Sequence, residues 1–227
     1  MKERPILFSA PMVRALLDGS KMQTRRVVKL PHANPLGQWE PTTWGGANGG
    51  RTEAGATVPE QGAIWHTRTG DTLTCPYGQP GDRLWVRETW ADLAVLSDGN
   101  YERQAIYRAD DIELYGDEDE PVNVNAPDMR WRPSIHMPRW ASRILLEVVS
   151  VRVERLNAIS ADDCDAEGIG QCDGLGTNAE ILDLARRMGT FADETLRYAT
   201  LWEQINGAGS WDANPWVWVV EFKQVTP

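Results

Sequence analysis

Two titratable side chains have neighbours that could give them a chemical role. Glu88 lies in the segment Trp-Val-Arg-Glu-Thr-Trp (85–90), so its carboxylate could line a pocket between aromatic rings. His136 carries the side chain that exchanges a proton most readily near neutral pH, so it could act as an acid–base group. Each residue also has a structural alternative. For Glu88 it is an ion pair with an arginine, and for His136, which directly precedes Met-Pro, it is a fixed hydrogen bond.

Flat and positively charged side chains form a second group of candidates. The chain has 11 tryptophans, and most of them are expected in the core because one Trp buries up to about 250 Å². A surplus of Trp also suits a pocket that stacks on flat rings. Arginines are concentrated at 25–26 and 139–143, which allows a local basic pocket. The tryptophans considered for ring stacking are Trp85, Trp140, Trp216 and Trp218.

The spacing of potential metal ligands does not favour a metal site. Cys75, Cys164 and Cys172 form no Cys-x-x-Cys pair, and the three histidines are scattered along the chain. Three aspartates fall within residues 162–165, but carboxylates in one short helix more often face water or the helix N-terminus. We therefore expect neither a metal nor another cofactor.

Length, composition and charge narrow the class of protein. The chain has 227 residues, of which 41% are hydrophobic and 25% charged, as expected for one soluble domain with its own core. It contains no apolar run of the roughly 18–20 residues that span a bilayer, no signal peptide pattern and few cysteines, so we expect a cytoplasmic protein. The net charge of −10 argues against a non-specific binder of long nucleic acids.

The elements that would position these residues begin with a compact N-terminal unit. Residues 6–8 are predicted to form a short strand, and a helix follows from Ser9, its N-cap, to Gly19, which ends it. Residues 21–24 are predicted as the turn out of that helix, and 25–29 as an extended segment.

Two insertions and a strand follow. Residues 31–79 are rich in Gly, Pro, Thr and Asn and are predicted to be loop-like, with a hairpin around 64–73. Residues 83–90 alternate as a strand with both faces partly buried. Residues 91–131 are predicted to be a second irregular insertion, with a solvated acidic run at 117–120.

The C-terminal third has the clearest periodicity. Residues 143–156 alternate as a strand, and a short helix over 161–167 is expected, capped by Ser160 and ended by Gly168. A Gly-rich loop and a longer helical tract follow, and 215–225 close the chain as a strand deep in the sheet. The pattern predicts an α+β fold with a small curved sheet or barrel.

Four motifs, in the expected order, resemble the ASCH domain of the PUA-like β-barrel superfamily. Gly-Ser-Lys-Met-Gln-Thr-Arg-Arg (19–26) resembles its G-x-K-x-x-T-x-R signature, and Pro-Gly-Asp-Arg-Leu-Trp-Val (80–86) resembles its GD-x-L-x-V strand. Residues 162–169 resemble its acidic short helix, and 214–222 resemble its closing aromatic strand. The resemblance implies a PUA-like small barrel with surrounding helices, formed by residues 1–227 as one domain with two insertions.

The same resemblance carries an expected function. PUA-like barrels generally bind RNA or a modified base, and the block 133–141 resembles ASCH proteins encoded by bacteriophages. One branch of the family is a small bacterial amidohydrolase that removes the acetyl group of N4-acetylcytidine with a Lys, a Thr and a Glu. These three residues correspond to Lys21, Thr24 and Glu167. The implied substrate is an N4-acylated cytosine nucleoside or a related modified base.

The chemistry of such a site requires these residue types. A threonine hydroxyl attacks an amide carbonyl only when another group accepts its proton. Lys21 stands three residues before Thr24, so a helical or turn conformation would place both side chains on one side. A partly desolvated Lys21 could act as the base, and Glu167 could orient Lys21 and pass a proton to the leaving amine. Arg26 or a backbone N–H group in the turn could stabilise the oxyanion.

Two other functions remain open. The chain could be a non-catalytic module of phage origin that binds RNA or a modified base. It could also act through protein contacts, with the acidic run 117–120 as the contact surface. The residues expected to bind the substrate are Arg25, Arg26, Trp85, Glu88, His136, Arg139 and Trp140.

Overall fold

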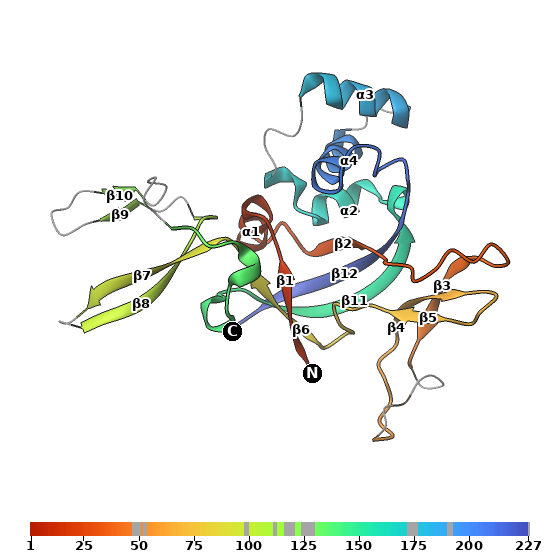
Figure 1. Ribbon diagram of the computed structural model, residues 1–227, viewed down its shortest axis with the longest axis horizontal. Helices are drawn as coiled ribbons and strands as arrows, with labels where there is room; N and C mark the ends of the chain where they lie inside the picture. The colour runs from red at the N-terminus through yellow and green to blue at the C-terminus, as the bar shows by residue number, and fades with distance from the viewer. Residues whose placement is uncertain are drawn as a thin grey trace.

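The computed structural model describes residues 1–46, 51, 54–97, 100–110, 113–115, 121–123, 130–171, 177–189 and 193–226. A five-stranded sheet lies at its centre, with helices on one side and a β-ribbon at each end (Figure 1). The fold is therefore α+β, as the sequence predicts.

The central sheet combines strands from both ends of the chain. Its order is β1-β6-β11-β12-β2, and only the pair β1–β6 is parallel. The terminal strand β12 lies between β11 and β2, so the expected deep position of the closing strand is confirmed. The five strands are β1 (Glu3–Leu7), β6 (Arg83–Arg87), β11 (Leu145–Arg155), β12 (Trp216–Val225) and β2 (Gln23–Val27).

The structure corrects the small β-barrel that the resemblance implies. Among the described residues the strands form an open sheet, with β1 and β2 as its edges. A barrel needs a ladder of backbone hydrogen bonds between the edge strands. Here a side chain makes the link instead, because the Arg26 guanidinium donates a hydrogen bond to the Leu7 carbonyl at 2.6 Å.

Strand β12 divides the core into two clusters. Side chains of a strand alternate between its two faces. Trp218 and Val220 therefore lie on one face of the sheet, and Val217 and Val219 lie on the other. Trp218 and Val220 belong to the cluster that includes strands β1, β6 and β11, together with the helix α1 (Ala10–Leu17). Val217 and Val219 belong to the cluster formed with the C-terminal helices.

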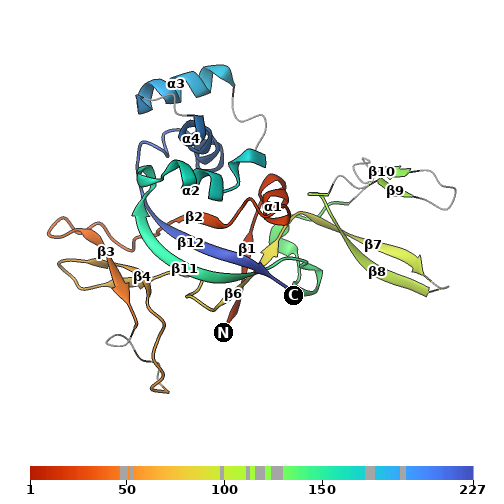
Figure 2. The same cartoon turned by 180° about the vertical axis from the view of Figure 1, so that it is seen from behind.

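Three helices cover the second cluster: α2 (Ala161–Ala166), α3 (Asn178–Met188) and α4 (Asp193–Asn206) (Figure 1, Figure 2). The predicted cap of α2 is confirmed, because Ser160 and Asp163 form a reciprocal capping box. The single helical tract that the sequence predicts is divided into α3 and α4.

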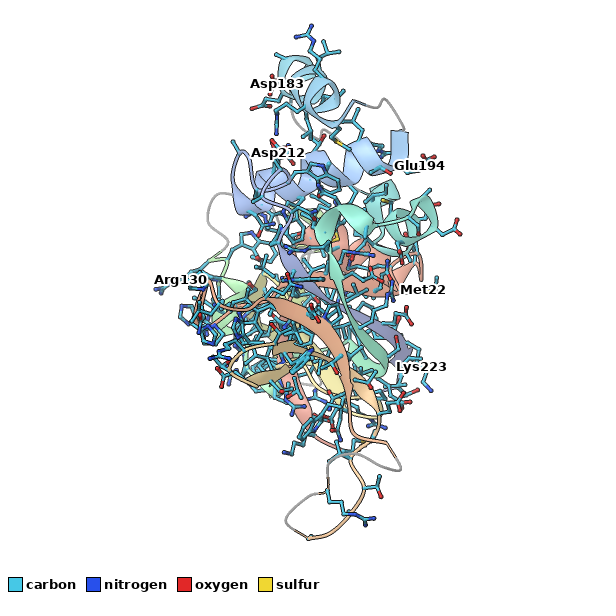
Figure 3. All side chains as sticks on the ribbon, turned by 90° about the vertical axis from the view of Figure 1, so that its right-hand side faces the viewer. Met22, Arg130, Asp183, Glu194, Asp212 and Lys223 are labelled. Atoms are coloured by element: carbon cyan, nitrogen blue, oxygen red, sulfur yellow. The ribbon has the colours of Figure 1, made fainter. Side chains whose placement is uncertain are left out.

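Arg187 joins the end of α3 to its neighbours. Its guanidinium contacts Asp183 on α3, Glu203 on α4 and Asp212 in the loop that follows. Figure 3 shows Asp183 and Asp212 together at the helical end of the molecule.

The first insertion is folded, which corrects the prediction of a loop-like segment. It forms a three-stranded antiparallel sheet in the order β3-β4-β5, and the expected hairpin around 64–73 is confirmed by the pair β4–β5. Trp39 and Ile64 are buried in the main core cluster, which explains why these strands are ordered. The strands are β3 (Trp39–Trp44), β4 (Gln61–His66) and β5 (Thr72–Thr74).

The second insertion also contains strands, so the prediction that residues 91–131 are irregular is wrong in part. Strands β7 (Trp90–Ser97) and β8 (Asn100–Tyr107) form a long hairpin that projects from the central sheet (Figure 1). A smaller pair, β9 (Glu113–Tyr115) and β10 (Pro121–Asn123), follows. The predicted acidic run 117–120 lies outside the described residues.

Four short 3-10 helices complete the described chain. The first two follow the second insertion, and the others flank α2. They are η1 (Ser134–His136), η2 (Arg139–Ala141), η3 (Leu156–Ala158) and η4 (Ile169–Gln171).

Candidate functional site

A cavity of about 220 Å³ lies along β2, an edge strand of the central sheet. Its walls come from four places: Phe8 with the start of α1, the strand β2, the buried side of α4, and Glu167 at the end of α2. Pockets for drug-sized ligands usually measure about 300–1,000 Å³, so this cavity suits a smaller molecule.

The hydrogen bonds of β2 explain why the cavity lies at this edge. Val28 N–H donates to the Trp216 carbonyl at 2.8 Å, and Phe222 N–H donates to the Met22 carbonyl at 2.9 Å. Alternate residues of an antiparallel strand bond to opposite sides, so Arg25 directs its backbone N–H and C=O away from β12. The open side of β2 therefore faces the cavity rather than a sixth strand.

Lys21 and Glu167 meet at one wall of this cavity. Lys21 Nζ donates to Glu167 Oε2 at 2.9 Å and to the Glu167 carbonyl oxygen at 2.7 Å. The two residues also form an isolated antiparallel bridge, and Met22 N–H donates to the Ala166 carbonyl at 2.8 Å. Their side chains are only 1% and 5% exposed. Two segments separated by 146 residues thus form one buried ion pair, as the resemblance implies.

Gly168 makes this approach possible. A Cβ atom at Gly168 would lie 2.7 Å from Ala15 Cβ and 2.9 Å from Lys21 Cβ, closer than such atoms approach. Its φ of +76° is also in the region that favours glycine. The residue that ends α2 therefore also lets Glu167 reach Lys21.

Thr24 shares the cavity with this pair, but for a different reason from the one predicted. The segment from Lys21 to Thr24 is extended rather than helical or turn-like, and residues three apart in a strand point to opposite faces. Both line the cavity because it lies at the edge of the sheet. The hydrogen bonds described for Lys21 Nζ both go to Glu167.

Arg25 holds Glu167 from its other side. Its fully buried guanidinium lies 3.3 Å from Glu167 Oε1, 3.1 Å from Asp163 Oδ2 and 3.3 Å from Glu154 Oε2. Three carboxylates therefore surround the guanidinium of Arg25, a residue that the sequence analysis expects to bind the substrate. Arg25 is placed to position Glu167 rather than to reach a ligand.

Asp163 is a carboxylate of this cluster whose pKa is lowered. Burial acts to raise its pKa, but the hydrogen bond from Gln23 and the charges of Arg25 and Arg152 together lower the pKa of Asp163 to about 2. The acids around Arg25 thus balance its buried charge.

Arg26 differs from Arg25 because it is only half-buried and lines the cavity. Its guanidinium carbon lies 5.4 Å from the centre of the Phe8 ring, and Lys21 Nζ lies 5.5 Å from the same ring. Phe8 therefore forms an apolar wall between two cationic side chains. Arg26 is the predicted binding residue that lies best to contact a ligand here.

The opposite wall, from α4, contains residues that sequence reasoning missed. Tyr198 and Trp202 line the cavity and are 4% and 5% exposed, and Asn206 follows them one turn later. Burial, with a further contribution from the Glu167 charge, raises the pKa of Tyr198 well above its ordinary value. The only signal in the sequence is the four-residue spacing of these side chains, which places them on one helix face.

Glu88 belongs to a separate buried ion cluster. Arg143 donates to both Glu88 oxygens, at 3.0 and 3.1 Å, and to Asp110 at 2.6 Å, and it lies 3.9 Å from the centre of the Tyr107 ring. Burial raises the pKa of Glu88, although Arg143 acts in the opposite direction. The structural alternative, an ion pair with an arginine, describes this arrangement.

The other four predicted binding residues also lie away from the cavity, whose described lining includes none of them. His136 is exposed in η1, and Arg139 pairs with Glu3 at 3.0 Å. Trp140 is 52% exposed beneath Arg103, and Trp85 is nearly buried beneath Arg87. These four residues therefore do not share the cavity with Lys21.

Cysteines and clustered acidic side chains are the residues to consider as ligands of a metal ion. Among the described residues no group of three or more His, Cys, Asp or Glu side chains is arranged to hold a metal ion. Cys75 and Cys164 are buried free thiols, and burial raises the pKa of each to about 11. Cys172 lies outside the described residues.

Comparison with known proteins found no matching family model, no matching curated protein and no matching solved structure. Within the described part of the chain, every helix is too short or too polar to cross a bilayer.

Proposed function

We propose that the chain is an ASCH-like amidohydrolase of the PUA-like class that acts on an N4-acylated cytosine nucleoside or a related modified base. One observation carries the proposal: the buried 2.9 Å pair of Lys21 and Glu167 borders a cavity that Thr24 also lines. An amine, a carboxylate and a hydroxyl are the three groups that the resemblance implies. A cavity with aromatic walls from Phe8 and Tyr198 suits a flat ring.

The proposed reaction consumes one water for each amide bond broken. The reaction requires Lys21 as a free amine, while Arg25 holds the Glu167 carboxylate beside it. Thr24 Oγ attacks the acyl carbon, and Lys21 accepts the hydroxyl proton. The C–N bond then breaks, the leaving amine takes a proton from the pair, and the acyl group remains as an ester on Thr24. Water, activated by the same amine, cleaves the ester to release the carboxylic acid and restore Thr24.

The surrounding charges have supporting roles in this proposal. Arg25 binds the second oxygen of Glu167 and fixes the carboxylate against Lys21. Arg26, at the mouth beside Phe8, is the candidate for contact with the ligand and with the negative charge that develops on the acyl oxygen. The cavity is largely apolar, which strengthens these interactions.

The test is hydrolysis of N4-acetylcytidine by the full chain, with cytidine and acetate measured by chromatography. We expect equal amounts of the two products. Thr24→Val removes only the hydroxyl and should lower kcat by about 10²–10⁴. Thr43→Val, at an exposed position of β3, is the matched control and should leave the rate unchanged. Absence of products from the wild-type chain, or full activity of Thr24→Val, would overturn the proposal.

A binding-only function is the second candidate, and one observation favours it. Lys21 Nζ already donates to two oxygens of Glu167, which ties the amine to the carboxylate. A site of this kind can hold a base without cleaving it. Under this alternative, the chain binds RNA with an affinity that falls as salt rises, because phosphate contacts release counterions. RNA binding with such a slope and no release of acetate would support it over the hydrolase.

A further inference from the structure

We propose that the indole N–H of Trp202 donates a hydrogen bond to the molecule that occupies the cavity. Helix α4 would thereby select ligands that present a carbonyl oxygen or an unprotonated ring nitrogen on that side. The inference rests on the proposed function in naming a nucleobase as the occupant, but it concerns recognition rather than cleavage.

The first observation is a buried donor without a partner. Trp202 is 5% exposed, and its Nε1 atom is buried with no hydrogen-bond partner among the described residues. A buried donor that has lost water and gained nothing in return destabilises the fold, so such groups are rare. A ligand acceptor would satisfy this donor.

The second observation is where the donor lies. Trp202 lines the cavity beside Tyr198, with ring centres 6.2 Å apart, and Phe8 and Lys21 line the same cavity. Trp90 also has a buried Nε1 without a described partner, but the described lining of this cavity does not include it. An unsatisfied indole alone therefore does not indicate a site. An unsatisfied indole in the wall of a cavity does.

The third observation is that two of the three cationic side chains in the cavity wall are already engaged, whereas Arg26, whose buried Nε has no partner among the described residues, is left for a charged group. Lys21 is bonded to Glu167, and the terminal nitrogens of Arg25 contact three carboxylates. Asn206 Nδ2 donates to the Trp202 carbonyl at 3.0 Å, which ties the last turn of α4 to the residue in question. The Trp202 indole is thus a neutral donor held on a rigid helix, which suits an uncharged acceptor such as the ring carbonyl of a pyrimidine.

The experiment observes the indole N–H directly. Uniformly 15N-labelled protein is titrated with N4-acetylcytidine, cytidine and pyrimidin-2-one, and with toluene as a ligand without an acceptor, while indole resonances are followed by NMR. Trp202→Phe assigns the signal. We expect the acceptor-bearing ligands to move the Trp202 indole proton downfield, and toluene not to. Trp202→Phe should raise the Kd of each acceptor-bearing ligand about fivefold, the effect of losing one neutral hydrogen bond.

Trp90→Phe is the matched control, because it removes another buried indole away from the cavity, and its Kd values should equal those of the wild type. A shift with pyrimidin-2-one but no hydrolysis of N4-acetylcytidine would support the inference while the proposed function fails. Hydrolysis with a KM unchanged in Trp202→Phe would overturn the inference and leave the proposed function intact. No shift of the Trp202 signal with any of these compounds would also overturn it.

Discussion

A single residue without a side chain controls how closely the two halves of the site approach. Gly168 has a φ of +76° and leaves no room for a Cβ atom between Ala15 and Lys21. The Lys21–Glu167 contact therefore depends on the absence of a side chain at Gly168.

We expect Gly168→Ala to lower the free energy of unfolding by about 2–4 kcal/mol, because backbone strain and overpacking add. Gly70→Ala is the matched control, since Gly70 has a φ of +77° but nothing within 4 Å of its virtual Cβ. That variant should lose only the strain, about 1–2 kcal/mol. Urea denaturation measures both. Equal losses in the two variants would show that the close approach of Gly168 to Lys21 is not a constraint.

The sequence alone could predict which residues meet, but not how. The resemblance pointed to Lys21, Thr24 and Glu167, and the structure brings all three to one cavity. The helical or turn spacing proposed for Lys21 and Thr24 is wrong, because the segment is extended and its open edge makes the cavity. The α4 wall, with Tyr198 and Trp202, could not be predicted, because the same spacing describes any core-facing helix face.

At the level of elements, Asp163 connects α2 to the sheet. It caps α2 through Ser160, accepts a hydrogen bond from Gln23 on β2, and pairs with Arg25 on β2 and Arg152 on β11. A helix of six residues has little stability of its own. This one carboxylate therefore fixes both the start of α2 and, through it, the position of Glu167.

The pKa of Asp163 predicts acid sensitivity. Its folded-state pKa of about 2 lies below the ordinary value of 3.8, so its ionised form is stabilised by folding. The resulting stabilisation, about 2 kcal/mol, is fully present above about pH 4 and is lost as the pH falls towards 2. Chemical denaturation between pH 2 and 6 measures it. Asp163→Asn should be less stable at pH 6 and lose less stability on acidification, and an unchanged acid limb would contradict this role.

Elements differed in how well they could be predicted. The strands β11 and β12 are rich in β-branched and other apolar residues, and both were predicted within two residues of their bounds. The strands of the first insertion were hidden by Gly, Pro and Thr, which are typical of loops, although Trp39 and Ile64 pack into the main core. Long-range packing, which composition does not reveal, ordered these segments.

At the level of the whole molecule, the site and the projecting hairpin are independent. The cavity is built from β2, α1, α4 and the end of α2, whereas β7 and β8 pair with each other away from it (Figure 1, Figure 2). The two insertions therefore extend the molecule without forming part of the described cavity wall.

Shortening this hairpin should leave the site intact. The change replaces residues 94–103 by Asn-Gly, so that Leu93 is joined to Gln104, a neighbouring pair in the β7–β8 register. Ala91, Ile106 and the cluster that they form remain. We expect the Kd for N4-acetylcytidine and the midpoint of urea unfolding to change little. A large loss of nucleoside binding would show that the hairpin contributes to the site.

A double-mutant cycle on N4-acetylcytidine hydrolysis shows whether Lys21 and Glu167 act as one unit in the proposed reaction. The variants Lys21→Met, Glu167→Gln and the double variant are compared by kcat/KM, with folding verified by circular dichroism. Residues that act as a unit are not additive, so each single change should cost about as much as both together. Independent, additive losses, or a single variant with wild-type kcat/KM, would contradict the account.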